Sequence, residues 1–483
     1  MDLDRYRAEV EQFTSAIDRE YYLHFSGQKD DFEIEEIYER HAGLFSRESV
    51  ERLRESGNSL LLDFAVKALI GRETKEDTAE LARREAALEI EADGETMPFR
   101  EAVVRQGNSP DPQRRAAIDA ARNAATATEL NPLLRALHER AHALAEELGW
   151  PSYLAMCEDL SGIDLEALGA QTDAFLEASD DAYEPLLAPE LERQLGLGFD
   201  RLRRADLPAF FRAPELDAAF QADRLVPSLG ETLAGMGIDV AAQPGVVLDT
   251  EARPKKSPRA FCAPVIVPDE IYLVIAPQGG RDDFAALFHE AGHTEHYAHI
   301  DRELPAEERY FGDNSITEGF AFLFEHLVSE PEWLRRRLGV SDVEPITRHA
   351  RASKLLYLRR YSAKLRYELE LHGEGAKPGA MPARYSELLG GALRVDWPQA
   401  TWLSDVDEFF YAARYLRAWA LETQLRGRLQ ERFGEAWFEQ PEAGEHLRAL
   451  WRSGQSAPAE ELLGDRLDFS VLLADLELGS TRA

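Results

Sequence analysis

The sequence predicts a mainly α-helical protein that contains one small β-sheet. Apolar residues recur at intervals of three and four through most of the 483 residues, which is the spacing of one face of a helix. One region, residues 238–277, changes to short β-branched and aromatic runs bounded by Pro, Gly and Asp. A helical string with two histidines follows it directly. Together these observations place a histidine-bearing helix beside a small sheet in an otherwise helical chain.

The composition is that of a globular protein with an acidic surface. Hydrophobic residues make up 44% of the chain, enough for a large core or for two lobes that share a cleft. The formal net charge of −34, from 55 basic and 89 acidic residues, argues against nucleic acid and anionic membranes as partners. The two cysteines, Cys157 and Cys262, are far apart, so we expect neither a disulfide framework nor a cysteine-ligated metal.

No segment predicts a membrane span or a secretory signal. No run approaches the roughly 18 apolar residues that a span needs. The first residues, MDLDRYRAEVEQF, are charged and amphipathic where a signal would be apolar. We therefore expect a cytoplasmic protein, present as a monomer or a small homo-oligomer.

Residues 1–165 are expected to form one helix after another. Turn residues interrupt the helical spacing at Ser26-Gly27, at Gly94 and at residues 107–110. The segment 73–95 is highly charged with a narrow apolar stripe, which predicts a long, partly solvated helix.

After a break at residues 149–153 the helical spacing resumes. It is expected to continue through Leu195, with Gly196 as the stop. The shorter, more aromatic pattern that follows is typical of a connection between two lobes. We therefore divide the chain into an N-terminal helical lobe, residues 1–200, and a lobe with the histidine string, residues 201–483, which could also act as one continuous unit.

Three short runs, GVVLDT, APVIVP and EIYLVIAP, predict the strands of the sheet. Pro264, Pro268 and Pro277 restrict strand length and favour edge positions, because proline cannot donate to a strand ladder. Such an edge could accept an extended peptide as an additional strand, or the strands could simply support the next helix. Asp282 or Asp283 is predicted to cap that helix.

The helix after the sheet carries His289, Glu290 and His293 in the string HEAGH. Histidines four residues apart project from one helix face about one turn apart, which is the spacing of two zinc ligands. A chain of this composition contains such a string by chance about once in 20 cases, so the string alone is moderate evidence. Phe284 and Leu287 mark a buried helix, in which such polar residues must be satisfied. The alternative is a pair of core histidines with ordinary hydrogen bonds.

A catalytic zinc site needs a third protein ligand and a position for water. Glu318 is the best candidate, because it is the single acidic residue before an apolar run, in a helix that Asn314 or Ser315 is predicted to cap. Glu325 lies two turns further along the same face. It could hydrogen-bond a ligand histidine or form an ordinary salt bridge.

With His289, His293 and Glu318 as ligands, we predict one Zn²⁺ per chain. Such an ion polarises a scissile carbonyl and lowers the pKa of water. Glu290 is the predicted catalytic base, which takes the water proton and later passes it to the leaving amine. His296 lacks the ligand spacing and is expected to pack or hydrogen-bond one turn beyond the metal.

An aromatic segment nearer the C-terminus supplies candidates for stabilising the oxyanion of a tetrahedral intermediate. Tyr411 and Tyr415 are four residues apart and therefore share a helix face. Both are predicted to be catalytic donors. The alternative for at least one of them is aromatic core packing.

Together these residues resemble the thimet oligopeptidase and oligoendopeptidase F family of zinc metallopeptidases. The family's helix reads H-E-x-G-H-x-x-H, as residues 289–296 do, and its two later glutamates are similar in spacing to Glu318 and Glu325. Its F-Y-x-x-x-Y pattern is similar to residues 410–415. The likeness covers about residues 115–430.

The resemblance implies a two-lobed, almost all-helical ellipsoid with a deep central channel and one small β-sheet beside the active-site helix. It implies a zinc oligopeptidase whose partners are short unfolded peptides. The alternatives are a metallocarboxypeptidase of the same fold and a peptide-binding protein with weak catalysis. The last alternative rests on a departure, since the family places a histidine shortly before the first tyrosine and this chain has Asp405 and Asp407 in that region.

Overall fold

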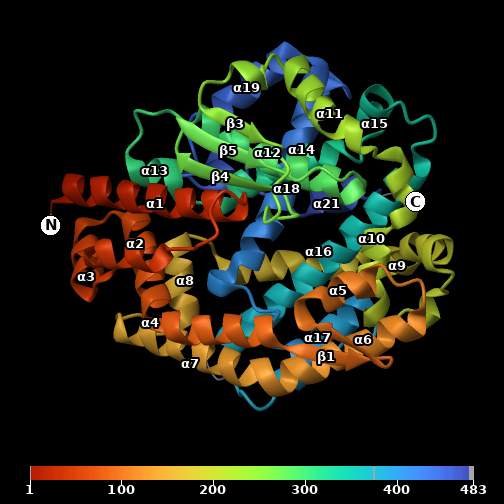
Figure 1. Cartoon of the computed structure of the whole chain (residues 1–483), viewed down its shortest axis with the longest axis horizontal. Coiled ribbons are helices and arrows are strands. Elements are labelled where there is room, and N and C mark those ends of the chain that lie inside the picture. Colours follow the sequence, from red (N-terminus) through yellow and green to blue (C-terminus); the bar gives the residue numbers. More distant parts are fainter. Residues whose placement is uncertain (1, 374–375, 478–483) are drawn as a thin grey trace. The chain divides into compact units, whose positions relative to one another are not determined.

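The computed structural model describes residues 2–373 and 376–477 and is mainly helical (Figure 1). Among these residues the strands form two small sheets, one of two strands and one of three. No helix in the described part of the chain is both long enough and apolar enough to cross a membrane. The mainly α fold class is therefore confirmed, with a second sheet that the sequence analysis did not predict.

Contacts divide the chain into two compact units, each assembled from separate segments. Unit 1 contains Met1–Val66, Leu216–Thr347 and Arg417–Leu472, and unit 2 contains Lys67–Glu215, Arg348–Leu416 and Leu473–Ala483. The lobes drawn from the sequence, residues 1–200 and 201–483, divide the chain continuously. The assignment of the histidine string to a separate lobe, residues 201–483, stays a prediction. The central channel also stays a prediction.

The elements of unit 1 are α1 (Leu3–Phe25), α2 (Ile34–Arg40), α3 (Arg47–Ser56), α11 (Ala222–Gly235), β3 (Val246–Asp249), β4 (Phe261–Ile266), β5 (Glu270–Val274), α12 (Arg281–His299), α13 (Ala306–Tyr310), α14 (Asn314–Leu327), α15 (Pro331–Leu338), α19 (Pro441–Trp451) and α20 (Ala459–Leu463). Those of unit 2 are β1 (Glu89–Ala92), β2 (Glu95–Pro98), α5 (Phe99–Gly107), α6 (Pro112–Ala125), α7 (Asn131–Glu147), α8 (Tyr153–Ser161), α9 (Leu165–Leu195), α10 (Leu207–Arg212) and α17 (Met381–Leu393). Residues of both units occur in α4 (Ser59–Ala87), α16 (Glu344–His372), α18 (Tyr411–Phe433) and α21 (Ser470–Asp475).

Several helices end where turn residues interrupt the helical spacing. α1 ends at Phe25, and Gly27 follows in the left-handed backbone region at φ 74°. α9 ends at Leu195, and Gly196 caps it at φ 62°. These two boundaries are confirmed as predicted.

The solvated helix predicted over residues 73–95 is wrong in its last part. α4 ends at Ala87, and β1 and β2 then pair as an antiparallel hairpin. Asp93 and Gly94 connect the strands, both at positive φ, which suits the two-residue turns whose twist matches that of paired strands. Ile90 is buried while the glutamates on either side of it are exposed, so a period of two replaces the helical period here.

The three runs predicted as strands form a mixed sheet in unit 1, in the order β3, β5, β4. β3 is parallel to β5, and β4 is antiparallel to it. β4 is therefore an edge strand, and it contains Pro264, as the proline argument predicted. α1 packs along β4, and α12 packs against β4 and β5 (Figure 1).

α12 and α14 pack closely because glycine lies at their contact. A Cβ atom on Gly292 of α12 would lie 2.5 Å from the carbonyl oxygen of Phe320 on α14. The same Cβ atom would lie 2.6 Å from the Cα atom of Ala321. Only a residue without a side chain allows this approach of two backbones. The contact brings the histidine string next to the predicted glutamate ligand.

The predicted caps of these two helices are wrong by a few residues. The N-cap of α12 is Gly280, and Asp282 and Asp283 lie inside its first turn, where their charges favour the helix dipole. The N-cap of α14 is Asp313, whose side chain accepts a hydrogen bond from the N–H of Ser315 at 3.0 Å. These corrections move only the first residue of each helix, so the same residues share a helix face as predicted.

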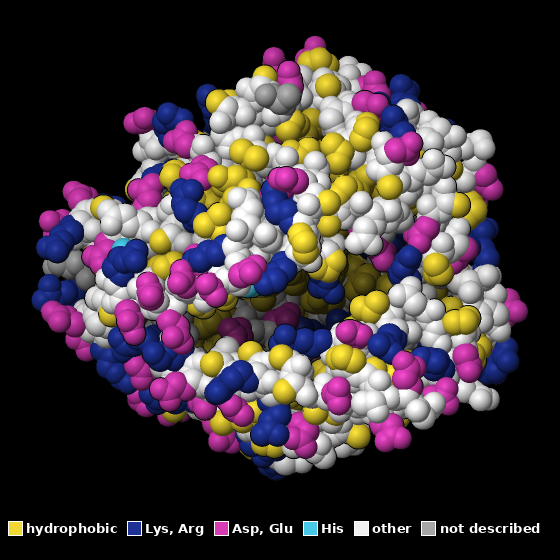
Figure 2. Space-filling model, viewed as in Figure 1, with side chains coloured by type: hydrophobic (Ala, Val, Ile, Leu, Met, Phe, Trp, Pro, Cys, Tyr) yellow, Lys and Arg dark blue, Asp and Glu magenta, His cyan; other side chains and the backbone are white. Residues whose placement is uncertain are grey.

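Charged side chains of both signs cover the face of the molecule shown in Figure 2. On this face Asp and Glu side chains are interspersed with Lys and Arg, and apolar side chains lie singly or in small groups between them. The acidic excess of the sequence is therefore mixed with basic residues there, as is usual for a solvated surface.

Candidate metal centre

Three potential ligand side chains converge in unit 1. One ligand atom each of His289, His293 and Glu318 lies within 4.8 Å of the other two. Glu318 Oε2 is 3.5 Å from His289 Nε2 and 3.7 Å from His293 Nε2. The ligands of a tetrahedral zinc ion, with bonds of about 2.0–2.1 Å, are about 3.3 Å apart. The donor atoms are therefore spaced for one ion.

Two helices position these donors. The histidines project one turn apart from α12, and Glu318 lies near the start of α14. Glu318 is buried, whereas the side chains of His289 and His293 are 20% and 14% exposed. The group thus combines a buried carboxylate with two partly exposed histidines.

The second ring nitrogen of each histidine has a hydrogen-bond partner. His289 Nδ1 is 2.9 Å from Glu325 Oε2, and His293 Nδ1 is 2.8 Å from Thr317 Oγ1. A metal ligand needs the proton on Nδ1 and the lone pair on Nε2, and these two oxygens can accept a hydrogen bond from Nδ1–H in that tautomer. Of the two alternatives for Glu325, the hydrogen bond to a histidine is the one present. Sequence reasoning missed Thr317, because a threonine beside a glutamate carries no distinguishing signal.

Burial lowers the pKa values of the two histidines, and the nearby carboxylates raise them. Burial lowers the pKa of His293 to about 4. Burial also acts to lower the pKa of His289, but hydrogen bonds to Glu318 and Glu325 outweigh it and raise that pKa to about 10. The carboxylates therefore favour a positive charge at this place, which a divalent cation also supplies.

Glu290 lies on the side of α12 that faces the sheet. Its carboxylate accepts a hydrogen bond from the backbone N–H of Cys262 on β4 at 2.9 Å. Burial raises the pKa of Glu290 to about 7. The sequence analysis treated Cys262 only as a small apolar residue, because no side-chain pattern signals the use of a backbone N–H.

The other predicted site residues lie outside this group of donors. His296 is fully buried and packs against Phe320 with ring centroids 5.1 Å apart, in line with the expected packing role. Tyr411 and Tyr415 lie side by side with ring centroids 4.9 Å apart, and Tyr415 also packs edge-on against Tyr361. Both tyrosines belong to unit 2. Their role as oxyanion donors stays a prediction.

The two aspartates that replace the expected histidine connect their segment to the rest of unit 2. Lys364 Nζ is 2.9 Å from Asp407 Oδ2, and the N–H of Asp407 donates to Glu368 at 2.8 Å. Asp405 accepts a hydrogen bond from the O–H of Tyr385 at 2.7 Å. Their contacts are those of a buried ionic network that fixes the chain before α18.

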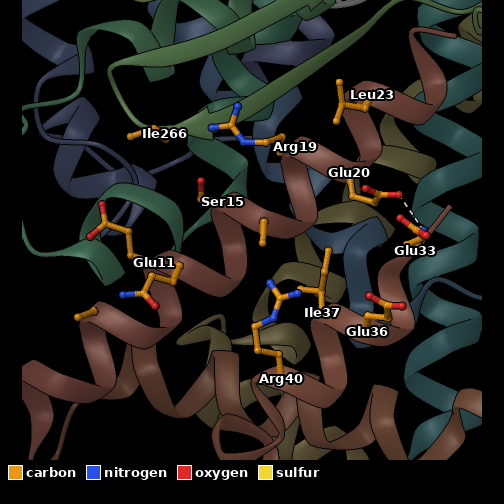
Figure 3. Close-up of a pocket in the computed structure, with 13 residues that line it drawn as sticks. Glu11, Ser15, Arg19, Glu20, Leu23, Glu33, Glu36, Ile37, Arg40 and Ile266 are labelled. Carbon is orange, nitrogen blue, oxygen red and sulfur yellow. Dashed lines mark hydrogen bonds between the residues drawn. The ribbon is translucent and has the colours of Figure 1, made fainter. Parts of the chain in front are cut away.

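A separate hollow of about 620 Å³ lies between α1 and α2 in unit 1 (Figure 3). Its lining combines charged side chains such as Arg19, Glu20 and Arg40 with apolar ones such as Ile266. The N–H of Glu33 donates to Glu20 at 2.7 Å across its rim. The predicted ligands and the predicted base are not among its lining residues.

No protein-family model and no curated protein matches the sequence. Solved structures do match the fold. One is the crystal structure of a protein from Bacillus anthracis str. Ames described as a "putative oligoendopeptidase F". It aligns with a TM-score of 0.61 over 96% of this chain and 85% of that chain, at 16% sequence identity. At this identity the similarity shows a shared fold, and function must be argued from the site.

Proposed function

We propose that this chain is a zinc-dependent metallopeptidase of the oligoendopeptidase F type, which hydrolyses short unfolded peptides in the cytoplasm. The proposal depends above all on the position of Glu318 Oε2, 3.5 and 3.7 Å from the Nε2 atoms of His289 and His293. The fold similarity to the Bacillus anthracis protein supports the same class of activity.

The donor set fits zinc. Two imidazole nitrogens and one carboxylate oxygen form a common ligand set of catalytic zinc, which keeps a fourth position for water or substrate. The exposed parts of both histidine side chains leave such a position toward solvent. When bound there, zinc polarises a carbonyl group and lowers the pKa of water.

Glu290 acts as the base and then as the acid. Its carboxylate removes a proton from the attacking water and delivers it to the leaving amine. The hydrogen bond from Cys262 N–H holds this carboxylate beside β4. Glu325 and Thr317 keep the two histidines in the tautomer with Nε2 free.

The substrate is an extended peptide that pairs with the edge strand β4. Because Glu290 contacts Cys262 on this strand, a peptide bond held alongside it lies near the base. A net charge of −34 favours peptides over nucleic acid or anionic membranes as partners.

Replacement of His289 tests the ligand assignment. Wild type should cleave an unstructured peptide, lose activity to a chelator and regain it with added zinc. His289→Ala should bind one zinc fewer per chain by atomic emission spectroscopy. Because the ion contributes several kcal/mol to catalysis, His289→Ala should also cleave about 10³-fold more slowly or worse.

His326→Ala is the matched control. His326 also belongs to unit 1, but it lies on α14, and its Nε2 pairs with Glu330 at 3.0 Å and takes no part in the metal group. This variant should keep its zinc and its activity. Undiminished cleavage by His289→Ala would overturn the proposal.

A further inference from the structure

A second cluster of histidines lies in unit 2. His138 and His142 are one turn apart on α7, and His372 is the last residue of α16. One nitrogen from each ring lies within 4.8 Å of those from the other two. We propose that these three histidines bind a divalent transition-metal ion of their own, in addition to the zinc at α12 and α14.

The closest pair in the cluster is already arranged as two potential ligands. His142 Nε2 is 2.8 Å from His372 Nδ1, a distance at which two imidazole nitrogens share one proton. An ion between these two nitrogens needs them about 3.3 Å apart, an increase of about 0.5 Å, and the shared proton moves to the other nitrogen of its own ring. Small rotations of the two rings accomplish this change. His138 supplies the third nitrogen, with its ring centroid 4.3 Å from that of His142.

His372 is the buried member of the cluster. Its side chain is 4% exposed, and its Nε2 has no hydrogen-bond partner among the described residues. A buried ring nitrogen without a partner is uncommon, because leaving it unpaired costs free energy. The other nitrogen, Nδ1, faces His142 Nε2, so Nδ1 is the atom that binds the ion and Nε2 then carries the ring proton.

The three rings are in the protonation state that metal ligands require. Burial, with repulsion from His142, lowers the pKa of His138 to about 4. Burial also lowers the pKa values of His142 and His372 below that of an ordinary histidine. At neutral pH each neutral ring therefore offers a lone pair, and binding displaces no proton from an imidazolium. Three imidazoles suit Zn²⁺, Co²⁺, Ni²⁺ or Cu²⁺.

Aromatic residues connect this cluster to the turn before α18. Tyr153 stacks on His142 with ring centroids 5.0 Å apart, and Phe410 packs against His372 at 5.0 Å. The hydroxyl oxygen of Tyr153 accepts a hydrogen bond from the N–H of Phe409 at 2.9 Å. Phe409 and Phe410 both have positive φ, which is rare for bulky residues. An ion that fixes the three histidine rings also stabilises the turn at Phe409 and Phe410, because Tyr153 and Phe410 pack against those rings.

Cobalt binding in a chain without the first metal group tests the proposal. His289→Ala/His293→Ala removes the two ligands on α12, so this background reports on the second cluster whether or not the protein is a peptidase. Titration with Co²⁺ should produce visible absorption bands of a nitrogen-ligated ion that saturate at one ion per chain. Added Zn²⁺ should remove these bands and raise the unfolding temperature of the same variant.

His138→Phe in this background is the informative variant, because a phenyl ring keeps the aromatic packing and removes one ligand. It should weaken Co²⁺ binding by about 100-fold or more. His446→Ala, on α19 of unit 1, is the control and should leave binding unchanged. The proposal is wrong if the folded background variant shows no cobalt bands and no thermal shift with Zn²⁺, or if His138→Phe binds as tightly as its parent. In either case the cluster is aromatic packing with one internal hydrogen bond.

Discussion

Glu325 is 40% exposed, yet its carboxylate lies 2.9 Å from Nδ1 of His289. An exposed ionic contact of this kind adds little to stability. This contact acts on the imidazole ring of His289, because a carboxylate that accepts a hydrogen bond from Nδ1–H fixes both the orientation and the tautomer of a metal ligand. Thr317 does the same for His293 as a neutral partner. At the residue scale, the metal group therefore depends on partners that never touch the metal.

We expect Glu325→Gln to weaken zinc binding by about 10–100-fold without unfolding the protein. The amide oxygen of glutamine can still accept a hydrogen bond from Nδ1–H, but the negative charge that makes His289 a stronger ligand is lost. Competition with a fluorescent chelator measures the change in Kd. The exposed Glu303 provides the control, since Glu303→Gln removes the same charge from the loop after α12. Equal affinities in the two variants would refute the role given to Glu325.

Glu368 of unit 2 provides a pH-dependent prediction. It is fully buried beside Lys364, Asp405 and Asp407, and burial raises its pKa to about 8. The unfolded chain has an ordinary carboxyl pKa of about 4.3, so the wild type loses stability as the pH rises from about 4 to 8. Glu368→Gln cannot ionise and should avoid this loss, gaining roughly 1–3 kcal/mol over wild type by about pH 9. Urea unfolding of both proteins between about pH 4 and 9 measures this difference in the free energy of unfolding. A difference that stays constant with pH would contradict the prediction.

At the scale of elements, the metal group exists because α12 and α14 approach each other at glycine. A Cβ atom on Gly292 would lie 2.5 Å from the Phe320 carbonyl oxygen and 2.6 Å from the Ala321 Cα atom, and these backbone atoms cannot rotate away. Any side chain at this position must move one helix relative to the other. Such a shift also separates the histidines of α12 from Glu318 of α14.

Gly292→Ala should therefore destabilise the protein by roughly 1–3 kcal/mol and weaken zinc binding in parallel. Gly427→Ala is the matched control, because Gly427 is also helical, in α18, and a Cβ atom there meets no atom within 4 Å. That variant should be neutral or more stable by about 0.5–1 kcal/mol. The denaturant midpoint and the zinc affinity of both variants are compared with those of wild type. A Gly292→Ala protein with wild-type zinc affinity would show that the helix contact does not set the donor geometry.

The sequence predicts those elements whose side chains repeat with one period over many residues. α9 ends at Leu195 as expected, because Gly196 adopts the left-handed backbone that stops a helix. The hairpin of β1 and β2 is missed, because charged residues on the exposed positions conceal the burial of Ile90. Helix caps depend on a single hydrogen bond, so the choice of Asp313 over its neighbours is set by the loop before it.

The same distinction applies to the candidate site. His289, His293 and Glu318 are found from the sequence, because ligand spacing on a helix and an isolated acid in an apolar run are local patterns. The N–H of Cys262 and the hydroxyl of Thr317 are found only in the structure. Tertiary folding brings these groups to the site, and neither has a residue type that signals its use.

At the scale of the whole molecule, the two units draw on separate stretches of the chain, and the metal group belongs to unit 1. The fold is shared with a solved structure at 16% identity, so the fold alone does not distinguish between cleavage inside a peptide and cleavage at its end. We expect cleavage inside the peptide. A carboxypeptidase needs the free terminal carboxylate, whereas an endopeptidase does not.

Comparison of one unstructured peptide with a free and an amidated C-terminus tests this expectation. An oligoendopeptidase should cleave both forms at similar rates and produce fragments from internal bonds, as mass spectrometry of the products would show. Loss of single C-terminal residues from the free form, with no cleavage of the amidated form, would identify a carboxypeptidase instead.

The most direct test of the peptidase assignment compares wild type with Glu290→Gln on a mixed peptide pool, with zinc content measured on the same samples. Glutamine keeps the hydrogen bond from Cys262 N–H but cannot accept the proton of the attacking water. We predict equal zinc in the two proteins and cleavage by Glu290→Gln reduced about 10²–10⁴-fold. Cleavage at the wild-type rate by Glu290→Gln, or no cleavage by a fully zinc-loaded wild type, would contradict the account.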